Sequence, residues 1–260
     1  MVHAFDRAAR TKGVMMFFVL IKLELLKLRR SLPLFVMFAC PLLVVLLTTG
    51  MVLQSGPNGP KAGFWVAFWK GNLALWSYFM LPLYIALVTA LLNGNEHRNQ
   101  AWRLLFTLPV TQRQVYLAKT ALAWGSVVGA NLALGLIAAG AAGVIMLLRP
   151  SAGPAFDVPI LPALAKLSLA CLPVVLIQHA LSWRVANFVL PLAVGICATM
   201  GIFQLSNTEY WAYFPWTYSL MTSNATDPAT QQLALVLAAG VGAVLLVITT
   251  YLAGKREIAA

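Results

Sequence analysis

The sequence predicts an all-α polytopic membrane protein, and three observations carry the prediction. Of the 260 residues, 61% are hydrophobic and only 10% are charged, with a mean hydropathy of +0.83, whereas soluble domains carry about 25% charged residues. Six apolar stretches are each long enough to cross a bilayer core, which takes roughly 20 helical residues. Basic residues also gather in alternate connectors between these stretches. A water-soluble fold could not hide so much apolar surface, so we expect lipid to be the solvent.

The expected architecture has six transmembrane helices between two cytoplasmic segments. Residues 1–32 form a cytoplasmic N-terminal segment, residues 33–253 the membrane domain and residues 254–260 a cytoplasmic tail. The six spans are expected at about 33–53, 72–94, 117–147, 161–181, 186–205 and 233–253. The fourth and fifth form a tight hairpin joined by Ser182, Trp183 and Arg184.

The distribution of basic residues predicts the orientation. Fourteen of the 18 Lys and Arg residues fall on the side that holds both termini, and four fall on the other side. Cytoplasmic connectors are enriched in Lys and Arg, so we expect both termini in the cytoplasm. The net charge of +11 sits in connectors rather than on one folded face. This favours contact with anionic lipid headgroups over nucleic-acid binding.

Three segments outside the spans have distinct patterns. Residues 14–30 are apolar first and then interleave leucine with cations, which is typical of an amphipathic helix lying on the membrane surface; an ordinary basic flank is the alternative. Residues 95–108 predict a short helix that Glu96 opens and Pro109 ends, followed by a capping box at Thr111 to Gln114. Such a helix between two spans suits a soluble partner, although an incidental interfacial turn has the same pattern.

The third segment, residues 207–224, is rich in aromatic residues and is predicted on the extracellular side. It is too short to span, so it predicts a re-entrant hairpin, with an aromatic-belt loop as the alternative. Within the third span, small residues predict close helix packing, either at a dimer seam or inside one subunit. They are Gly125, Gly129, Gly135, Ala139 and Gly143.

The residues give no sign of a catalytic or metal site. Cys40, Cys171 and Cys197 lie far apart in apolar runs, where cysteine acts as a small hydrophobe. None of the three histidines is paired with a nucleophile, and we expect His179 to be a structural residue. The phosphate-binding pattern G-x-x-x-x-G-K-[ST] is missing, so this chain is not expected to hydrolyse ATP.

The chain resembles the permease subunits of ABC-2-type ABC transporters, with the closest likeness to bacterial lantibiotic-immunity and bacitracin-type exporter permeases. The matching motifs are Glu96-His97-Arg98-Asn99, Trp102-Arg103, Leu108-Pro109-Val110, Tyr116-Leu117-Ala118-Lys119, Gln178-His179-Ala180-Leu181-Ser182, Asn187-Phe188 with Pro191, Phe214-Pro215-Trp216 and Lys255-Arg256-Glu257-Ile258.

The resemblance implies roles for the three segments. The segment after the second span would be a coupling helix that docks on an ABC ATP-binding subunit, and the amphipathic helix would frame the same interface. The coupling residues would be Glu96, His97, Arg98, Asn99, Trp102 and Arg103. The hairpin would close the extracellular end of the pathway through Glu209, Tyr210, Trp211, Phe214, Pro215 and Trp216.

The same resemblance implies a working unit of two permeases, identical or paralogous, and two ATPase subunits in a bacterial cytoplasmic membrane. ATP and Mg²⁺ would bind to the partner ATPase, and the substrate would be an amphiphile such as an antimicrobial peptide. The alternative is an ion-coupled secondary transporter, which would use carboxylates inside the membrane; all seven acids lie in connectors, tails or span edges. An intramembrane enzyme is a third possibility, with no recognisable nucleophile to support it.

Overall fold

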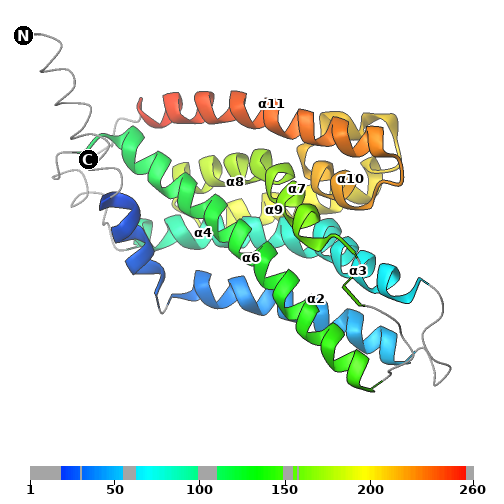
Figure 1. The fold of residues 1–260 in the computed structure, drawn as a ribbon. Coiled ribbons are helices and arrows are strands. Elements are labelled where there is room, and N and C mark those ends of the chain that lie inside the picture. The colour runs from blue at the N-terminus through cyan, green and yellow to red at the C-terminus, as the bar shows by residue number, and fades with distance from the viewer. Residues whose placement is uncertain are drawn as a thin grey trace, which may run out of the picture.

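The computed structural model describes residues 19–29, 31–54, 63–98, 110–148, 155–156 and 158–255, which form helices joined by short turns (Figure 1). The long helices α2, α4 and α11 run along a common direction, and α6 crosses them obliquely. A helix over residues 19–28 precedes α2. The elements that follow are α2 (Leu32–Gln54), α3 (Phe64–Leu75), the π-helical turn η1 (Trp76–Met80), α4 (Leu81–Arg98), α6 (Gln112–Leu148), α7 (Ile160–Ala170), α8 (Leu172–Arg184), α9 (Val189–Leu205), the 3-10 turns η3 (Glu209–Tyr213) and η4 (Pro215–Thr217), α10 (Tyr218–Asn224) and α11 (Pro228–Ala253).

Helices lie in all six stretches that the sequence predicts as spans. Four are long and apolar enough to cross a membrane, namely α2, the continuous helix Phe64–Gly94, α6 and α11. The pair α7 and α8 qualifies as a fifth only when the two are taken together, because they are bent by 42° around Cys171. Helix α9 has 17 residues, fewer than the roughly 20 of a full span, so a sixth span stays a prediction.

Two boundaries differ from those predicted. The second span begins at Phe64 rather than residue 72, because α3 and α4 continue through η1 without a break. Ser182, Trp183 and Arg184 are the last residues of α8 rather than a connector. Ser182 and Trp183 are buried and Ser182 accepts a hydrogen bond from Asn93, so these residues are held inside the bundle. The turn lies at 185–188 instead.

Some glycines of α6 pack against other helices of the bundle, and others face open space. A Cβ atom on Gly129 would press on Met37 of α2, and one on Gly135 would meet Leu164 of α7. Gly125 and Gly143 have no atom within 4 Å of such a Cβ atom. Packing inside the subunit therefore accounts for Gly129 and Gly135, and the dimer seam stays a prediction for the others.

The bundle has two ends that differ in chemistry. At the end that we call the terminal end, the helix over 19–28, the start of α6, the end of α8 and the end of α11 pack together through Leu20, Val115, Tyr116, Ala118, Trp183 and Ala253. At the opposite end, which we call the hairpin end, η3, η4 and α10 fold beside the start of α11 (Figure 1).

Candidate functional site

A buried ion pair fastens the helix over 19–28 to α6 at the terminal end. Leu20 and Glu24, one helical turn apart, both face the bundle and are 5% and 6% exposed. The Nζ atom of Lys119 lies 3.1 Å from Oε2 of Glu24, and Nζ of Lys27 lies 2.6 Å from Oε1. Lys119 itself is only 1% exposed. Both oxygens of the carboxylate are therefore bound to ammonium groups.

The surroundings of Glu24 decide its charge. Burial by itself raises the pKa of a carboxyl group, because it penalises the charged form. Here the positive charges of Lys119 and Lys27 and their hydrogen bonds outweigh burial, so the pKa of Glu24 is lowered below its ordinary value. Glu24 is thus ionised at neutral pH and supplies the charge that a buried lysine requires.

Lys119 also extends the contact to α4 and, from there, to α8. Its Nζ donates to the carbonyl oxygen of Leu92, at 3.3 Å. The next residue, Asn93, donates from Nδ2 to Oγ of Ser182, at 2.8 Å, and lies 3.1 Å from Nδ1 of His179. We call Glu24, Lys119, Asn93, His179 and Ser182 the polar junction. All five side chains are buried.

Aromatic rings enclose the polar junction. The ring of Tyr116 lies 4.8 Å from that of His179 and 5.2 Å, edge to face, from that of Trp183, measured between centroids. His179 is fully buried between them, as expected for a structural histidine. The junction thus joins the helix over 19–28, α4, α6 and α8 in one place.

The predicted coupling residues begin directly beyond this junction. Glu96, His97 and Arg98 lie in the last turn of α4, which runs to Arg98, so Glu96 does not open a separate helix. Asn99, Trp102 and Arg103 lie outside the described residues. The predicted capping box at the start of α6 is confirmed. The backbone nitrogen of Thr111 donates to Oε1 of Gln114 at 3.0 Å, and that of Gln114 donates to Oγ1 of Thr111 at 3.3 Å.

The predicted gate hairpin consists of an exposed part and a buried part. Glu209 and Tyr210 are exposed at its tip, whereas Trp216 is only 6% exposed. The ring of Trp216 stacks on that of Phe214 at 5.4 Å. Trp211 and Pro215 are partly buried, and Oγ1 of Thr217 donates to the carbonyl oxygen of Trp211 at 2.7 Å. The chain therefore turns inward after η3.

Helix α10 is hydrogen-bonded to the π-helical turn in the second predicted span. Oγ of Ser223 and Nδ2 of Asn224 donate to Oγ of Ser77 at 2.8 and 3.0 Å, and Oγ of Ser219 donates to the carbonyl oxygen of Ser77 at 3.2 Å. π-Helical turns are rare and are frequent at functional sites. The hairpin is thus attached to the one irregular turn of the helix 64–94.

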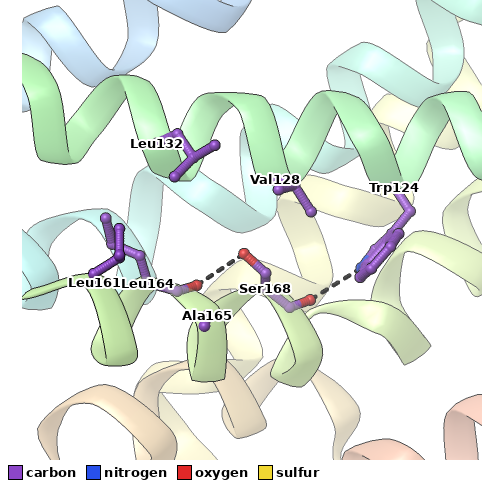
Figure 2. Close-up of a pocket in the computed structure, with 7 residues that line it drawn as sticks. All are labelled: Trp124, Val128, Leu132, Leu161, Leu164, Ala165 and Ser168. Atoms are coloured by element: carbon purple, nitrogen blue, oxygen red, sulfur yellow. Dashed lines mark hydrogen bonds between the residues drawn. The ribbon is translucent and has the colours of Figure 1, made fainter.

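A second buried contact connects this turn to the bent helix pair. Asn131 of α6 accepts from Nε1 of Trp76 and donates to Oγ of Ser168 in α7, both at 2.8 Å. Figure 2 shows Ser168 at the edge of an apolar pocket of about 290 Å³ between α6 and α7. The indole of Trp124 points to the carbonyl oxygen of Ser168. The Oγ atom of Ser168 donates to the carbonyl oxygen of Leu164. Every polar group drawn there is paired within the protein.

Some of these contacts have a partial signal in the sequence. Lys119 lies one position after Ala118 in a segment whose neighbours Val115 and Tyr116 are buried, and a lone cation on an apolar helix face requires a partner. The partner, Glu24, is 95 positions away, and only folding brings the two together. Asn131 in an apolar helix carries the same kind of signal.

In the described part of the chain, no group of three or more His, Cys, Asp or Glu side chains could hold a metal ion. The three cysteines are unpaired. The buried polar groups found here form hydrogen bonds between helices.

Apolar helices of spanning length define the class of protein as a multi-pass membrane protein. Residues 20–203 match the family model for the ABC-2 family transporter protein, and the chain therefore belongs to the ABC-2 family. Members of this family are membrane components of ABC transporters and associate with an ABC ATP-binding subunit. No curated protein gives a significant sequence match to the chain.

Proposed function

We propose that this chain is the permease subunit of an ATP-driven exporter in a bacterial cytoplasmic membrane. It spans the membrane six times with both termini in the cytoplasm and works with a second permease and two ATPase subunits, which bind ATP and Mg²⁺. The substrate is an amphiphile drawn from the membrane, such as an antimicrobial peptide of the lantibiotic type. The terminal end is then cytoplasmic and the hairpin end extracellular.

The observation that carries the proposal is the place of Lys119. Its ammonium group contacts Glu24 on the helix over 19–28 and the Leu92 carbonyl oxygen on α4, while Lys119 itself belongs to α6. Residues 99–109 connect α4 to α6, so both helices that flank the coupling segment meet at this one side chain. A movement of that segment caused by an ATPase would be transmitted through Lys119 to the helix over 19–28, α4 and α6. Through Asn93 it would also be transmitted to α8.

Charge supports the orientation. The described cations at the terminal end include Lys22, Arg29, Arg113, Arg184 and Lys255, whereas the acids in the described helices at this end are Glu24 and Glu96. The described acids Glu209 and Asp227 lie at the hairpin end. Cations on the cytoplasmic side follow the positive-inside rule.

The hairpin supports a gate at the extracellular end. Its buried part is bonded to Ser77, and Ser77 lies on the helix that continues to the predicted coupling segment. Opening the hairpin and moving the coupling segment would then both act on the helix 64–98. This shared helix favours an ATP-driven gate over an ion-coupled carrier.

The experiment is copurification of the permease with its ABC ATP-binding subunit, followed by ATPase and transport assays in proteoliposomes. Trp102→Ala should weaken association by about thirtyfold, because truncating a buried interface aromatic costs about 2 kcal/mol or more. Glu96→Gln should have a smaller effect, since a charge near a helix end contributes about 0.3–1 kcal/mol. Phe35→Ala is the control, because Phe35 is an aromatic residue of α2 that is 68% exposed. Wild-type association and transport in both test variants would refute the coupling assignment.

A further inference from the structure

A groove at the terminal end lies between the helix over 19–28, the start of α2 and α6. Its volume is about 340 Å³, which is within the range of about 300–1,000 Å³ of small-molecule sites. Its walls are almost entirely aliphatic, with Leu25 and Leu28 on one side, Leu34 on the second and Leu122 on the third. Leu25 is 51% exposed, so the groove opens outward.

Among the described residues that line the groove, the charged one is Arg29, an exposed residue at the turn before α2. The buried acid at this end, Glu24, is already bound by Lys27 and Lys119. The positive charge of Arg29 is therefore not neutralised by a described carboxylate. An apolar groove with a guanidinium group at its mouth matches a molecule that has a hydrocarbon chain and an anionic head.

A glycine of α6 lines the groove and leaves space beside it. A Cβ atom on Gly125 would have no atom within 4 Å, so any larger side chain there projects into the space. The neighbouring Ser126 adds no free polar group, because its hydroxyl donates to the Leu122 carbonyl oxygen at 2.8 Å. Its carbonyl oxygen accepts from the Tyr84 hydroxyl at 3.0 Å. This part of α6 is thus suited to contact with a hydrocarbon chain.

We propose that this groove binds one anionic phospholipid, with an acyl chain between α2 and α6 and its phosphate at Arg29. Arginine binds phosphate through two parallel N–H donors, and the membrane itself supplies the ligand. The bound lipid fills the space between the helix over 19–28 and α6. It thereby stabilises the packing of the helix over 19–28 on α6, together with the ion pair of Glu24. This site does not depend on the transported substrate.

The test is a lipid titration of the full-length protein in mild detergent, read by native mass spectrometry. Phosphatidylglycerol and phosphatidylcholine with the same acyl chains are compared. We expect one phosphatidylglycerol to bind before any other lipid. Arg29→Gln should weaken its binding by about fivefold, the effect of one basic residue at an anionic surface, while Arg29→Lys should keep the preference for the anionic lipid.

Two further variants test the groove itself. Gly125→Leu should abolish the first binding event for both lipids, and Gly125→Ala, which adds one methyl group to open space, should reduce it while leaving the fold intact. The matched controls are Gly143→Leu, at an equally open glycine of the same helix, and Arg113→Gln, an exposed cation of the same end; neither should change binding. Equal binding of the two lipids by the wild type, or unchanged binding in Arg29→Gln or in both Gly125 variants, would overturn the proposal.

Discussion

Glu24 and Lys119 form an ion pair across 95 sequence positions, with 3.1 Å between Oε2 and Nζ, and their side chains are only 8% and 1% exposed. The pair attaches a helix outside the membrane spans to the start of a membrane helix. Removal of one partner from a buried pair costs roughly 3–5 kcal/mol, since the other charge stays buried and unpaired. Replacement of both partners by neutral side chains costs much less.

The first prediction is a mutant cycle at this pair. Glu24→Gln should destabilise the protein by roughly 3 kcal/mol, and the double variant Glu24→Gln/Lys119→Met by clearly less, because no buried charge remains. Thermal unfolding of the detergent-solubilised protein, followed by tryptophan fluorescence, measures the two single variants Glu24→Gln and Lys119→Met and the double variant. Additive effects of the two single substitutions would show that the ion pair does not couple them.

The second prediction concerns pH. The pKa of Glu24 in the folded protein is lower than its ordinary value of 4.5, so folding favours the ionised form. The stability that it contributes is fully present above pH 4.5 and is lost as the pH falls through the lowered pKa. The melting temperature of the wild type should therefore drop in this acidic range.

The control for the pH experiment is Glu24→Gln, in which that loss should be smaller. Some slope will remain in the variant, because hydrogen bonds from Thr230 and from the backbone of Ala229 also lower the pKa of Asp227, which caps α11. Identical pH profiles for the wild type and Glu24→Gln would contradict the prediction.

The third prediction addresses Asn131. Asn131→Leu removes the acceptor of the Trp76 indole and the donor to Ser168. Side-chain hydrogen bonds between membrane helices contribute about 0.6 kcal/mol on average and up to about 2 kcal/mol, so we expect a loss of roughly 1–2 kcal/mol in thermal unfolding. Leu136→Ala, at a site of the same helix that is 75% exposed, should leave the stability almost unchanged.

The fourth prediction compares two glycines. A Cβ atom on Gly195 of α9 would collide with Ala86 of α4, whereas one on Gly240 of α11 would meet nothing within 4 Å. Gly195→Ala should destabilise by about 1–3 kcal/mol through overpacking. Gly240→Ala should be neutral or stabilise by up to about 1 kcal/mol, since alanine favours the helix. Equal melting temperatures for the two variants would argue against the α4–α9 contact.

The fifth prediction concerns orientation. In a cysteine-free background, Tyr213→Cys, at a site that is 84% exposed, should react with a membrane-impermeant maleimide in intact cells. Lys255→Cys, at the other end of the bundle, should react only after the membrane is opened. Reaction of Lys255→Cys in intact cells would reverse the proposed topology.

Composition and periodicity were enough to predict the helices, because lipid-facing helices must be long and apolar. The capping box at Thr111 and Gln114 was equally predictable, since it depends on residues three positions apart. Helix ends were less predictable. From sequence alone, Ser182, Trp183 and Arg184 suggest a connector because they interrupt an apolar run. In the structure Ser182 and Trp183 are buried in α8, where Ser182 accepts a hydrogen bond from Asn93.

Long-range pairing was the part that the sequence could not supply. Lys119 lies at the edge of the predicted third span, and its local sequence does not name a partner, yet it is buried against Glu24. Trp76 read as an ordinary residue of a span, yet it is completely buried and bonded to Asn131. The partners of Lys119 and Trp76 depend on which helices cross and where they cross. A local sequence pattern does not contain this information.

The π-helical turn η1 sets how well the second span could tolerate a change in length. Before the turn, Trp69 faces the Ala155 carbonyl oxygen; after it, Tyr84 faces that of Ser126 on α6. A π-helical turn holds about one residue more than an α-helical turn, because its hydrogen bonds span five residues rather than four. Deletion of one residue within η1 should therefore convert it to an α-helical turn and leave both faces close to their partners. A second deletion, with no π-helical turn left to absorb it, would rotate one half of the helix against the other by about 100°, the angle per residue of an α-helix, and should be far more harmful.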